Sequence, residues 1–116
     1  MYKNHIVGKK GEDIVTDFFK KKGYKIIERN FFCNQGEIDI IAVDKNEIVF
    51  IEVKTRNNTN YGMPSEAVTK EKQKHFKRAT EYYIYKNNLY NEFIRLDVVE
   101  VLFKEDKCII NHIKQM

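Results

Sequence analysis

The stretch that decides the fold runs from Gly36 to Lys54 and reads GEIDIIAVDKNEIVFIEVK. It contains two runs rich in Ile, Val and Phe, residues 37–44 and 47–54, and such residues are typical of β-strands. The dipeptide Lys45-Asn46 separates the two runs and has the length of a tight turn. The stretch therefore predicts a β-hairpin in which the numbers of paired residues sum to 91.

This register divides the side chains of the hairpin between two faces. One face is wholly apolar and is expected to be core; it comprises Ile38, Ile40, Ala42, Val49, Ile51 and Val53. On the other face Asp39 lies opposite Glu52, and Glu37 lies opposite Lys54. Directly opposed residues have Cβ atoms about 4.5–5.5 Å apart, where like charges repel. The Asp39–Glu52 pair therefore requires a proton on one carboxylate or a cation between the two.

A hard divalent cation suits this pair of carboxylates. Mg²⁺ is bound through one or two carboxylates and completes its octahedron with waters and phosphate oxygens. Lys54 lies two residues beyond Glu52 on the same face, about 6.6 Å further along the strand. An ammonium group there can neutralise a scissile phosphate or hold the attacking water. Asp39, Glu52 and Lys54 therefore predict a phosphodiester-hydrolysing centre. Glu37 could pair with Lys54 or bind the metal, and we expect it to pair with Lys54.

The alternative for these three residues is a structural role. Glu-x-Lys on one strand face is common as a surface salt bridge, and residues 39, 52 and 54 would then form an ion-pair cluster without chemistry. In that case Asp39→Asn would change stability and leave the affinity for divalent metal unchanged. An Asp between two Ile residues of a strand favours the catalytic interpretation, because strands are depleted in Asp and a buried Asp needs a partner.

A helix is predicted upstream of the hairpin, from about Gly11 to Lys22, with Gly23 as its stop. In this prediction Glu12 opens the helix, and Val15 and Phe19 follow it on the same side. Glu12 therefore points toward whatever the helix covers and is a candidate third carboxylate of the site. The alternative is an acid placed near a helix N-terminus only because the helix dipole favours it there.

The rest of the chain completes an α-β-β-β-α-β-β order. Further strands are expected at 24–32, 93–103 and 107–113, a polar loop at 55–64, and a long helix from Ser65 or Thr69 to Asn87. The chain has 116 residues, which is the size of one domain, and no repeat or linker interrupts it. We expect a single α/β domain over residues 1–116.

Composition excludes several classes of protein. No apolar run approaches the roughly 20 residues of a membrane span, and the N-terminus lacks the apolar core of a signal peptide, which predicts a cytoplasmic protein with no membrane partner. Cys33 and Cys108 stand alone, which argues against a disulfide scaffold or a structural zinc site. Ser65 is the only serine, and no glycine-rich nucleotide-binding motif is present.

The charge balance favours a polyanionic partner. Lys and Arg number 21 against 17 Asp and Glu, which gives a net charge of +4, and the excess is clustered. Clustered cations suit nucleic acid; the alternative is a lysine-rich helix face exposed to solvent.

Together the motifs resemble the bacterial YraN-like family. They are G-E (11–12), E-R-N (28–30), G-E-I-D-I-I (36–41), V-F-I-E-V-K-T-R (49–56), Y-G-x-P-x-E-A-V (61–68) and R-L-D-V-V-E-V (95–101), in order through nearly the whole chain. That family is placed by similarity in the restriction-endonuclease-like, or PD-(D/E)XK, superfamily, near archaeal Holliday junction resolvases. The resemblance implies an α-β-β-β-α-β core with a mixed central sheet flanked by helices.

The resemblance also implies roles for individual residues. The superfamily's Asp plus Glu-x-Lys centre falls on Asp39, Glu52 and Lys54, and the helix-one glutamate of resolvase-like members falls on Glu12. Lys72 and Gln73 fall where many members place a polar residue of the second helix near the site. This sequence departs from the family pattern at two places. Thr80 stands where Ala is usual. Asn34 and Gln35 stand where a basic residue is expected, which weakens the expected DNA contact at this loop.

The sequence therefore predicts an enzyme: a DNA endonuclease dependent on Mg²⁺ or Mn²⁺ and selective for branched or junction DNA by shape. Asp39 and Glu52 would hold the metal, Lys54 would activate the nucleophile and Glu12 would assist. DNA contacts are expected from the 57–63 loop and from Lys9, Lys10, Arg56, Lys70, Lys72, Gln73 and Lys77. A homodimer would suit a junction-cutting enzyme, although nothing in the sequence requires one. The alternative function is a non-catalytic DNA-binding or repair accessory module that keeps the nuclease fold.

Overall fold

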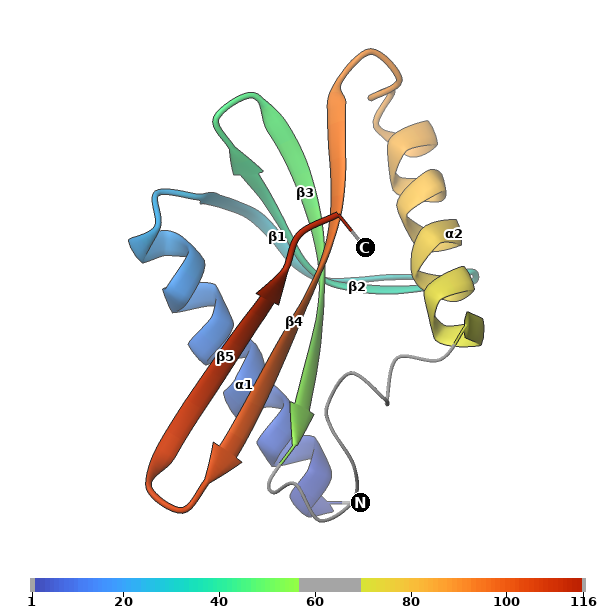
Figure 1. Cartoon of the computed structure of the whole chain (residues 1–116). Helices are drawn as coiled ribbons and strands as arrows, with labels where there is room; N and C mark the ends of the chain where they lie inside the picture. The colour runs from blue at the N-terminus through green and yellow to red at the C-terminus, as the bar shows by residue number, and fades with distance from the viewer. Residues whose placement is uncertain (1, 57–69, 116) are drawn as a thin grey trace.

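The computed structural model describes residues 2–56 and 70–115, which form two helices and one five-stranded sheet (Figure 1). In chain order the elements are α1 (Tyr2–Lys21), β1 (Lys25–Cys33), β2 (Gly36–Asp44), β3 (Glu47–Arg56), α2 (Lys70–Lys86), β4 (Phe93–Lys104) and β5 (Lys107–Ile113). The strands lie in the order β1-β2-β3-β4-β5. Only the β3–β4 pairing is parallel, so the sheet is mixed. The predicted α/β fold and its α-β-β-β-α-β core are confirmed.

Element boundaries differ from the prediction at two places. α1 begins at Tyr2, about nine residues earlier than expected, so Glu12 lies in the helix interior. Thr55 and Arg56 belong to β3 and not to the predicted loop. The rest of that loop and the predicted start of the second helix, residues 57–69, lie outside the described residues. Neither described helix has the length and apolar character that crossing a membrane would require.

The sheet has a hydrophobic core on each face, one under each helix (Figure 1). The core under α1 contains Val15, Phe19, Tyr24, Ile40, Ala42, Val49, Ile51, Val99 and Val101. The core under α2 contains Phe31, Ile38, Ile41, Phe50, Phe76, Ala79 and Tyr83. Ile38 therefore does not share a face with Ile40 and Ala42, and this part of the predicted face assignment is wrong.

Ile38 faces α2, and not α1, because the β1–β2 hairpin changes direction at Asn30. Asn30 has a φ of 55°, in the left-handed region that non-glycine residues rarely adopt. Its neighbours pair regularly, Arg29 with Ile40 and Phe31 with Ile38, yet Phe31 packs under α2 while Arg29 bonds to Asp13 of α1. Beyond Asn30 the hairpin thus swings toward α2, and Figure 1 shows its tip reaching that helix.

The tip of the β1–β2 hairpin is fixed to α2. His75 Nδ1 lies 3.1 Å from the carbonyl oxygen of Gln35. Gly36 follows with a φ of 153°, and a Cβ there would lie 2.8 Å from the His75 carbonyl oxygen. Only glycine allows this approach of two backbones, so Gly36 determines where the start of β2 is anchored.

A buried ion network holds the turn of the β2–β3 hairpin against β4. The Arg95 guanidinium is 5 % exposed and bonds to the fully buried Asp97, to Asp44 and Glu47 at the hairpin turn, and to the Tyr24 hydroxyl. Every partner except Tyr24 is an acid, so the network satisfies the buried charge of Arg95. The hairpin is therefore fixed at its turn by Arg95 and at its open end by α2.

Candidate active site

The candidate site lies where β2 and β3 separate. Their ladder pairs Asp44 with Glu47 at the turn and ends at Ile40 with Ile51, and every pair sums to 91 as predicted. Beyond that point the Val53 N–H donates to Asp39 Oδ2 at 2.7 Å, so a side chain replaces the next ladder bond.

The predicted direct pairs Asp39–Glu52 and Glu37–Lys54 are thus not formed as ladder pairs. The physical reason is the anchoring of the β1–β2 tip on α2, which draws the start of β2 away from β3. Glu37 lies opposite Phe32 in the β1–β2 ladder. In residues 2–56 and 70–115 the ion pair of Lys54 is with Glu52, so the expected Glu37–Lys54 pairing is also wrong.

The Asp39 carboxyl is nevertheless influenced by neighbouring carboxylates. Burial is the largest effect on its carboxyl group and raises the pKa, and the negative charges of Glu12, Glu37 and Glu52 raise it further. The hydrogen bond from the Val53 N–H lowers the pKa, and the net result is a pKa of about 7. The charges of three acids, one from each of α1, β2 and β3, therefore act on the Asp39 carboxyl.

Glu52 and Lys54 form a close pair beside Asp39. Lys54 Nζ lies 2.9 Å from Glu52 Oε1, and the two side chains are 18 % and 13 % exposed. The second carboxylate oxygen, Glu52 Oε2, is buried, and no described residue donates a hydrogen bond to it. A buried acceptor without a donor is costly to the fold, and a cation bound at this oxygen would remove that cost.

Glu12 reaches the site because α1 packs unusually close to β3. A Cβ added to Gly11 would lie 2.2 Å from Thr55 Oγ1, so glycine is needed for the helix to lie this close. Glu12 Oε1 lies 3.9 Å from Arg29 Nη2, which also binds Asp13. Since Glu12 is in the helix interior, its position does not result from the helix N-terminus, and the prediction that it faces the site is supported.

Glu100 is a neighbour of the site that the sequence analysis did not identify. It lies beside Lys54 in the parallel β3–β4 register, is 6 % exposed and accepts a hydrogen bond from Asn111. Its Oε2 is buried without a donor among the described residues. The available signal was an acid inside the apolar strand VVEVL, 98–102, although nothing local pairs that strand with β3.

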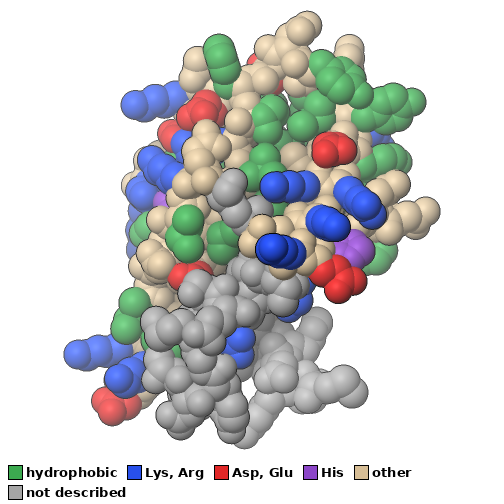
Figure 2. All heavy atoms as spheres, turned by 45° about the vertical axis from the view of Figure 1, so that its right-hand side comes forward, with side chains coloured by type: hydrophobic (Ala, Val, Ile, Leu, Met, Phe, Trp, Pro, Cys, Tyr) green, Lys and Arg blue, Asp and Glu red, His purple; other side chains and the backbone are tan. Residues whose placement is uncertain are grey.

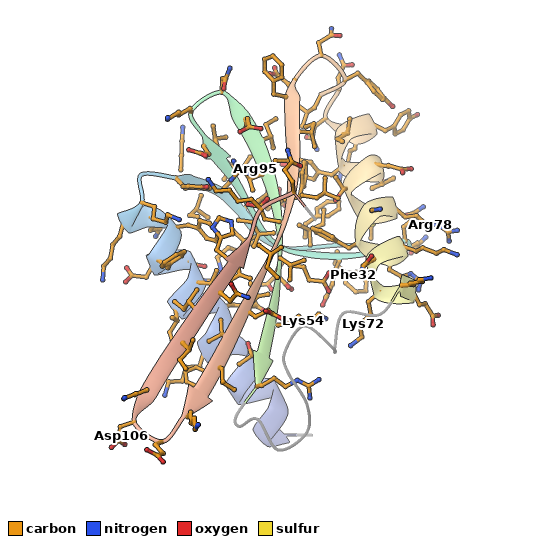
Figure 3. The ribbon with its side chains drawn as sticks, viewed as in Figure 1. Phe32, Lys54, Lys72, Arg78, Arg95 and Asp106 are labelled. Atoms are coloured by element: carbon orange, nitrogen blue, oxygen red, sulfur yellow. The ribbon has the colours of Figure 1, made fainter. Side chains whose placement is uncertain are left out.

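The predicted DNA-contacting residues that the structure describes lie in three elements, α1, α2 and the end of β3. Lys9 and Lys10 are exposed on α1, and Lys10 Nζ lies 5.4 Å from the centre of the Phe103 ring. The members on α2 are Lys70, Lys72 and Lys77, which are exposed, and Gln73, which is half-buried. Figure 3 draws Lys72 at the end of α2 that faces Lys54, and Figure 2 shows cations gathered on the outer face of that region. Arg56 ends β3 and is half-buried, whereas the 57–63 loop lies outside the described residues.

The chemistry of the site fits a hard divalent cation. Glu52 offers a buried oxygen without a donor, and Asp39 has a carboxyl group whose charge is opposed by three neighbouring acids. Both features favour a bound cation, and carboxylate oxygens are the ligands of Mg²⁺ and Mn²⁺. Among the described residues no three acid, His or Cys side chains are already arranged as a cation cage; the Asp39 carboxylate is turned to the Val53 N–H instead.

Comparison with known proteins agrees with the resemblance in the motifs. A model of the uncharacterised protein family UPF0102 matches residues 11–101. A UPF0102 protein of Caldicellulosiruptor saccharolyticus is 48 % identical over 110 residues, which cover 93 % of each chain. A UPF0102 protein of Clostridium botulinum is 53 % identical over 102 residues, covering 87 % of this chain and 83 % of its own.

Another relative, the UPF0102 protein TTE1452 of Caldanaerobacter subterraneus, is 46 % identical over 110 residues. The match includes both halves of the candidate site, from Gly11 in α1 to Val101 in β4. The YraN-like resemblance is confirmed: the chain belongs to the protein family UPF0102.

Proposed function

We propose that this protein is a metal-dependent endonuclease that hydrolyses phosphodiester bonds in DNA and selects branched or junction DNA by shape. The observation that supports it best is the fork between β2 and β3. There the charges of Glu12 and Glu52 act on the Asp39 carboxyl, and Lys54 contacts Glu52. Acids that can hold a divalent cation, with a lysine beside them, suit the stabilisation of negative charge on a phosphate.

In this proposal Asp39 and Glu52 hold Mg²⁺ or Mn²⁺. A divalent cation held by these two residues would stabilise negative charge on the phosphate and lower the pKa of a water. Lys54 orients the attacking water and neutralises the scissile phosphate with its ammonium group. Glu12 assists from the other face of the sheet by accepting a hydrogen bond from that water. Lys72 and the other cations of α2 hold phosphates next to the site, without reading sequence.

A non-catalytic DNA-binding module is the second candidate, and one observation favours it. The Asp39 carboxyl already accepts the Val53 N–H, and burial raises its pKa, so without a metal the proton competes with a cation for this group. Both candidates predict salt-sensitive DNA binding. Only the enzyme predicts that one side chain can be essential for turnover and unimportant for binding.

The test is cleavage of labelled four-way junction, flap, single-stranded and duplex DNA in Mg²⁺, Mn²⁺ or EDTA. Wild type is compared with Asp39→Asn, Lys54→Ala and the control Lys20→Ala, which removes an exposed lysine at the end of α1. We expect metal-dependent cutting that falls at least 100-fold in both site variants, while Lys54→Ala binds DNA within about threefold of wild type. Binding without cutting by any protein would establish the non-catalytic module instead.

A further inference from the structure

The outer face of α2 carries a row of cations that the catalytic proposal uses only in part. Lys70, Lys74, Lys77 and Arg78 are all exposed, and Figure 3 shows Arg78 directed away from the sheet. Lys74 and Arg78 are four residues apart and therefore lie on the same side of the helix. Tyr85 follows seven residues after Arg78 and continues this row.

At its C-terminal end the same row meets exposed aromatic rings. Tyr85, near the end of α2, and Tyr90, just after it, are 69 % and 65 % exposed. Figure 2 shows hydrophobic side chains gathered next to the cations on this face of the molecule. Large aromatic side chains are seldom left in water without a binding role when they gather in one place.

An open cavity lies beside Tyr90. Its volume is about 360 Å³, and it is lined by Ile84, Leu89, Tyr90, Ile94 and Glu81. The walls are apolar apart from the Tyr90 hydroxyl and the Glu81 carboxylate. A flat, partly apolar group with a hydrogen-bond donor at its edge would suit this lining, because the ring can stack on Tyr90 while its donor meets Glu81.

We propose that this aromatic end of α2, formed by Tyr85 and by Tyr90 at the cavity, binds unpaired bases of a nucleic-acid strand whose phosphates lie along the cations of α2. The proposal rests on the proposed function, and it assigns to the site a substrate with a single-stranded segment beside the duplex. Aromatic platforms next to a row of cations are how proteins bind single strands without sequence preference.

Charge makes nucleic acid the better occupant of this surface than a second copy of the chain. A two-fold contact through the outer face of α2 would bring Lys70, Lys74, Lys77 and Arg78 close to the same four cations of the partner copy. A nucleic-acid strand meets these cations with phosphates and the rings with bases. The net charge of +4 for the whole chain acts in the same direction.

The distance along α2 connects the aromatic end with the candidate active site. Lys72 lies at the end of α2 that faces Lys54, and Tyr85 lies thirteen residues further along. At a rise of 1.5 Å per residue this separation is about 20 Å, or roughly six nucleotides at the 3.4 Å spacing of a duplex strand. One DNA molecule can therefore contact both places.

The experiment measures binding by fluorescence anisotropy in EDTA, so that no cleavage occurs. The probes are a labelled single strand of mixed sequence, the same strand with abasic positions, a blunt duplex, and that duplex with a single-stranded tail. The test variant is Tyr85→Ala with Tyr90→Ala, and the matched control is Tyr85→Phe with Tyr90→Phe, which keeps both rings. Ile109→Ala, at an exposed apolar residue of β5, controls for general loss of surface apolar area.

We expect the alanine variant to bind the single strand and the tailed duplex at least tenfold more weakly than wild type, because each stacked base contributes to affinity. The phenylalanine variant and Ile109→Ala should stay within twofold. The abasic strand should bind wild type at least tenfold more weakly than the intact strand, and blunt duplex should respond little to the variants. If the double alanine variant does not fold, the single variant Tyr85→Ala is measured instead, because this side chain is 69 % exposed and its removal leaves the core intact.

Equal affinity for intact and abasic strands, or unchanged affinity in the alanine variant, would overturn the proposal. A wild-type dimer that the alanine variant converts to monomer, measured by light scattering, would also overturn it and assign the face to a contact between copies. Because these measurements contain no metal, they can succeed when cleavage is absent. Conversely, cleavage of blunt or junction DNA can persist in a variant that no longer binds unpaired bases. The nuclease proposal and the base-stacking proposal can therefore be refuted independently.

Discussion

Replacing Asp39 by Asn tests the electrostatics of the site most directly. The variant keeps an oxygen that can accept the Val53 N–H and removes the carboxylate charge. In the unfolded chain this carboxyl ionises near pH 3.8, whereas in the folded protein it ionises only at about pH 7. The folded state therefore binds more protons between these values, and the stability of the wild type falls as pH rises from about 4 to about 7.

The size of this loss follows from the difference of about three pKa units. At 1.36 kcal/mol per unit, the raised pKa lowers the stability of the folded state by about 4 kcal/mol at pH 8, where both states are ionised, and by about 1 kcal/mol at pH 4.5, where only the unfolded chain is ionised. Asp39→Asn is expected to regain these amounts, so it should be more stable than wild type and most clearly so at pH 8. Urea unfolding at both pH values measures the difference, and Asp17→Asn, at an exposed residue paired with Lys21, is the control.

Divalent metal provides a second readout on the same variant. At a Mg²⁺ or Mn²⁺ concentration ten times its dissociation constant, wild type should gain about 1.4 kcal/mol and Asp39→Asn little. Equal gains in both proteins would show that Asp39 is no metal ligand and favour the structural ion-pair cluster. A variant that is less stable than wild type to the same degree at pH 4.5 and pH 8 would refute the reasoning about buried charge altogether.

Three further outcomes follow from the packing and the buried ions. Gly11→Ala should destabilise the fold by about 1–3 kcal/mol and move α1 from β3, and combining it with Thr55→Ala should restore part of the loss, as a double-mutant cycle in urea would measure. Arg95→Met should cost about 3–5 kcal/mol of unfolding free energy, because it leaves Asp97 buried without its cation. Burial raises the pKa of Asp97, but hydrogen bonds from His112, Arg95 and a backbone N–H outweigh burial and lower the pKa. The ionised Asp97 therefore stabilises the fold above about pH 4, and this contribution is lost as pH falls further. In acid unfolding, Asp97→Asn should lose less stability below about pH 4 than wild type.

The hairpin register and the choice of site residues could be predicted from the sequence because both depend on local periodicity. Alternation along β2 and β3 and a two-residue turn are enough to align Ile40 with Ile51. Helical spacing was likewise enough to direct Glu12 toward the sheet, even though α1 starts much earlier than predicted. These patterns act over a few residues and are read directly from the chain.

The separation of β2 from β3 could not be predicted, because it depends on contacts between distant segments. It requires the left-handed Asn30 and the contact of Gly36 with His75, which is 39 positions further along the chain. Glu100 was missed for the same reason, since the parallel pairing of β3 with β4 connects it with Lys54 across 46 positions. Strand order is set by tertiary packing, and alternation within one strand does not encode it.

The separation of the strands also explains how acids from both faces of the sheet can act on one another. In a continuous β2–β3 ladder a backbone carbonyl would accept the Val53 N–H, and the sheet would stand between Glu12 on α1 and Glu52 on the opposite face. Here the Asp39 carboxylate accepts that N–H within the plane of the sheet, so its charge is felt by acids on both sides. The fold thus accepts a buried carboxyl that is destabilising when ionised. A cation at Glu52 and Asp39 would offset that cost, which is the physical reason to expect metal binding and fold stability to be linked in this protein.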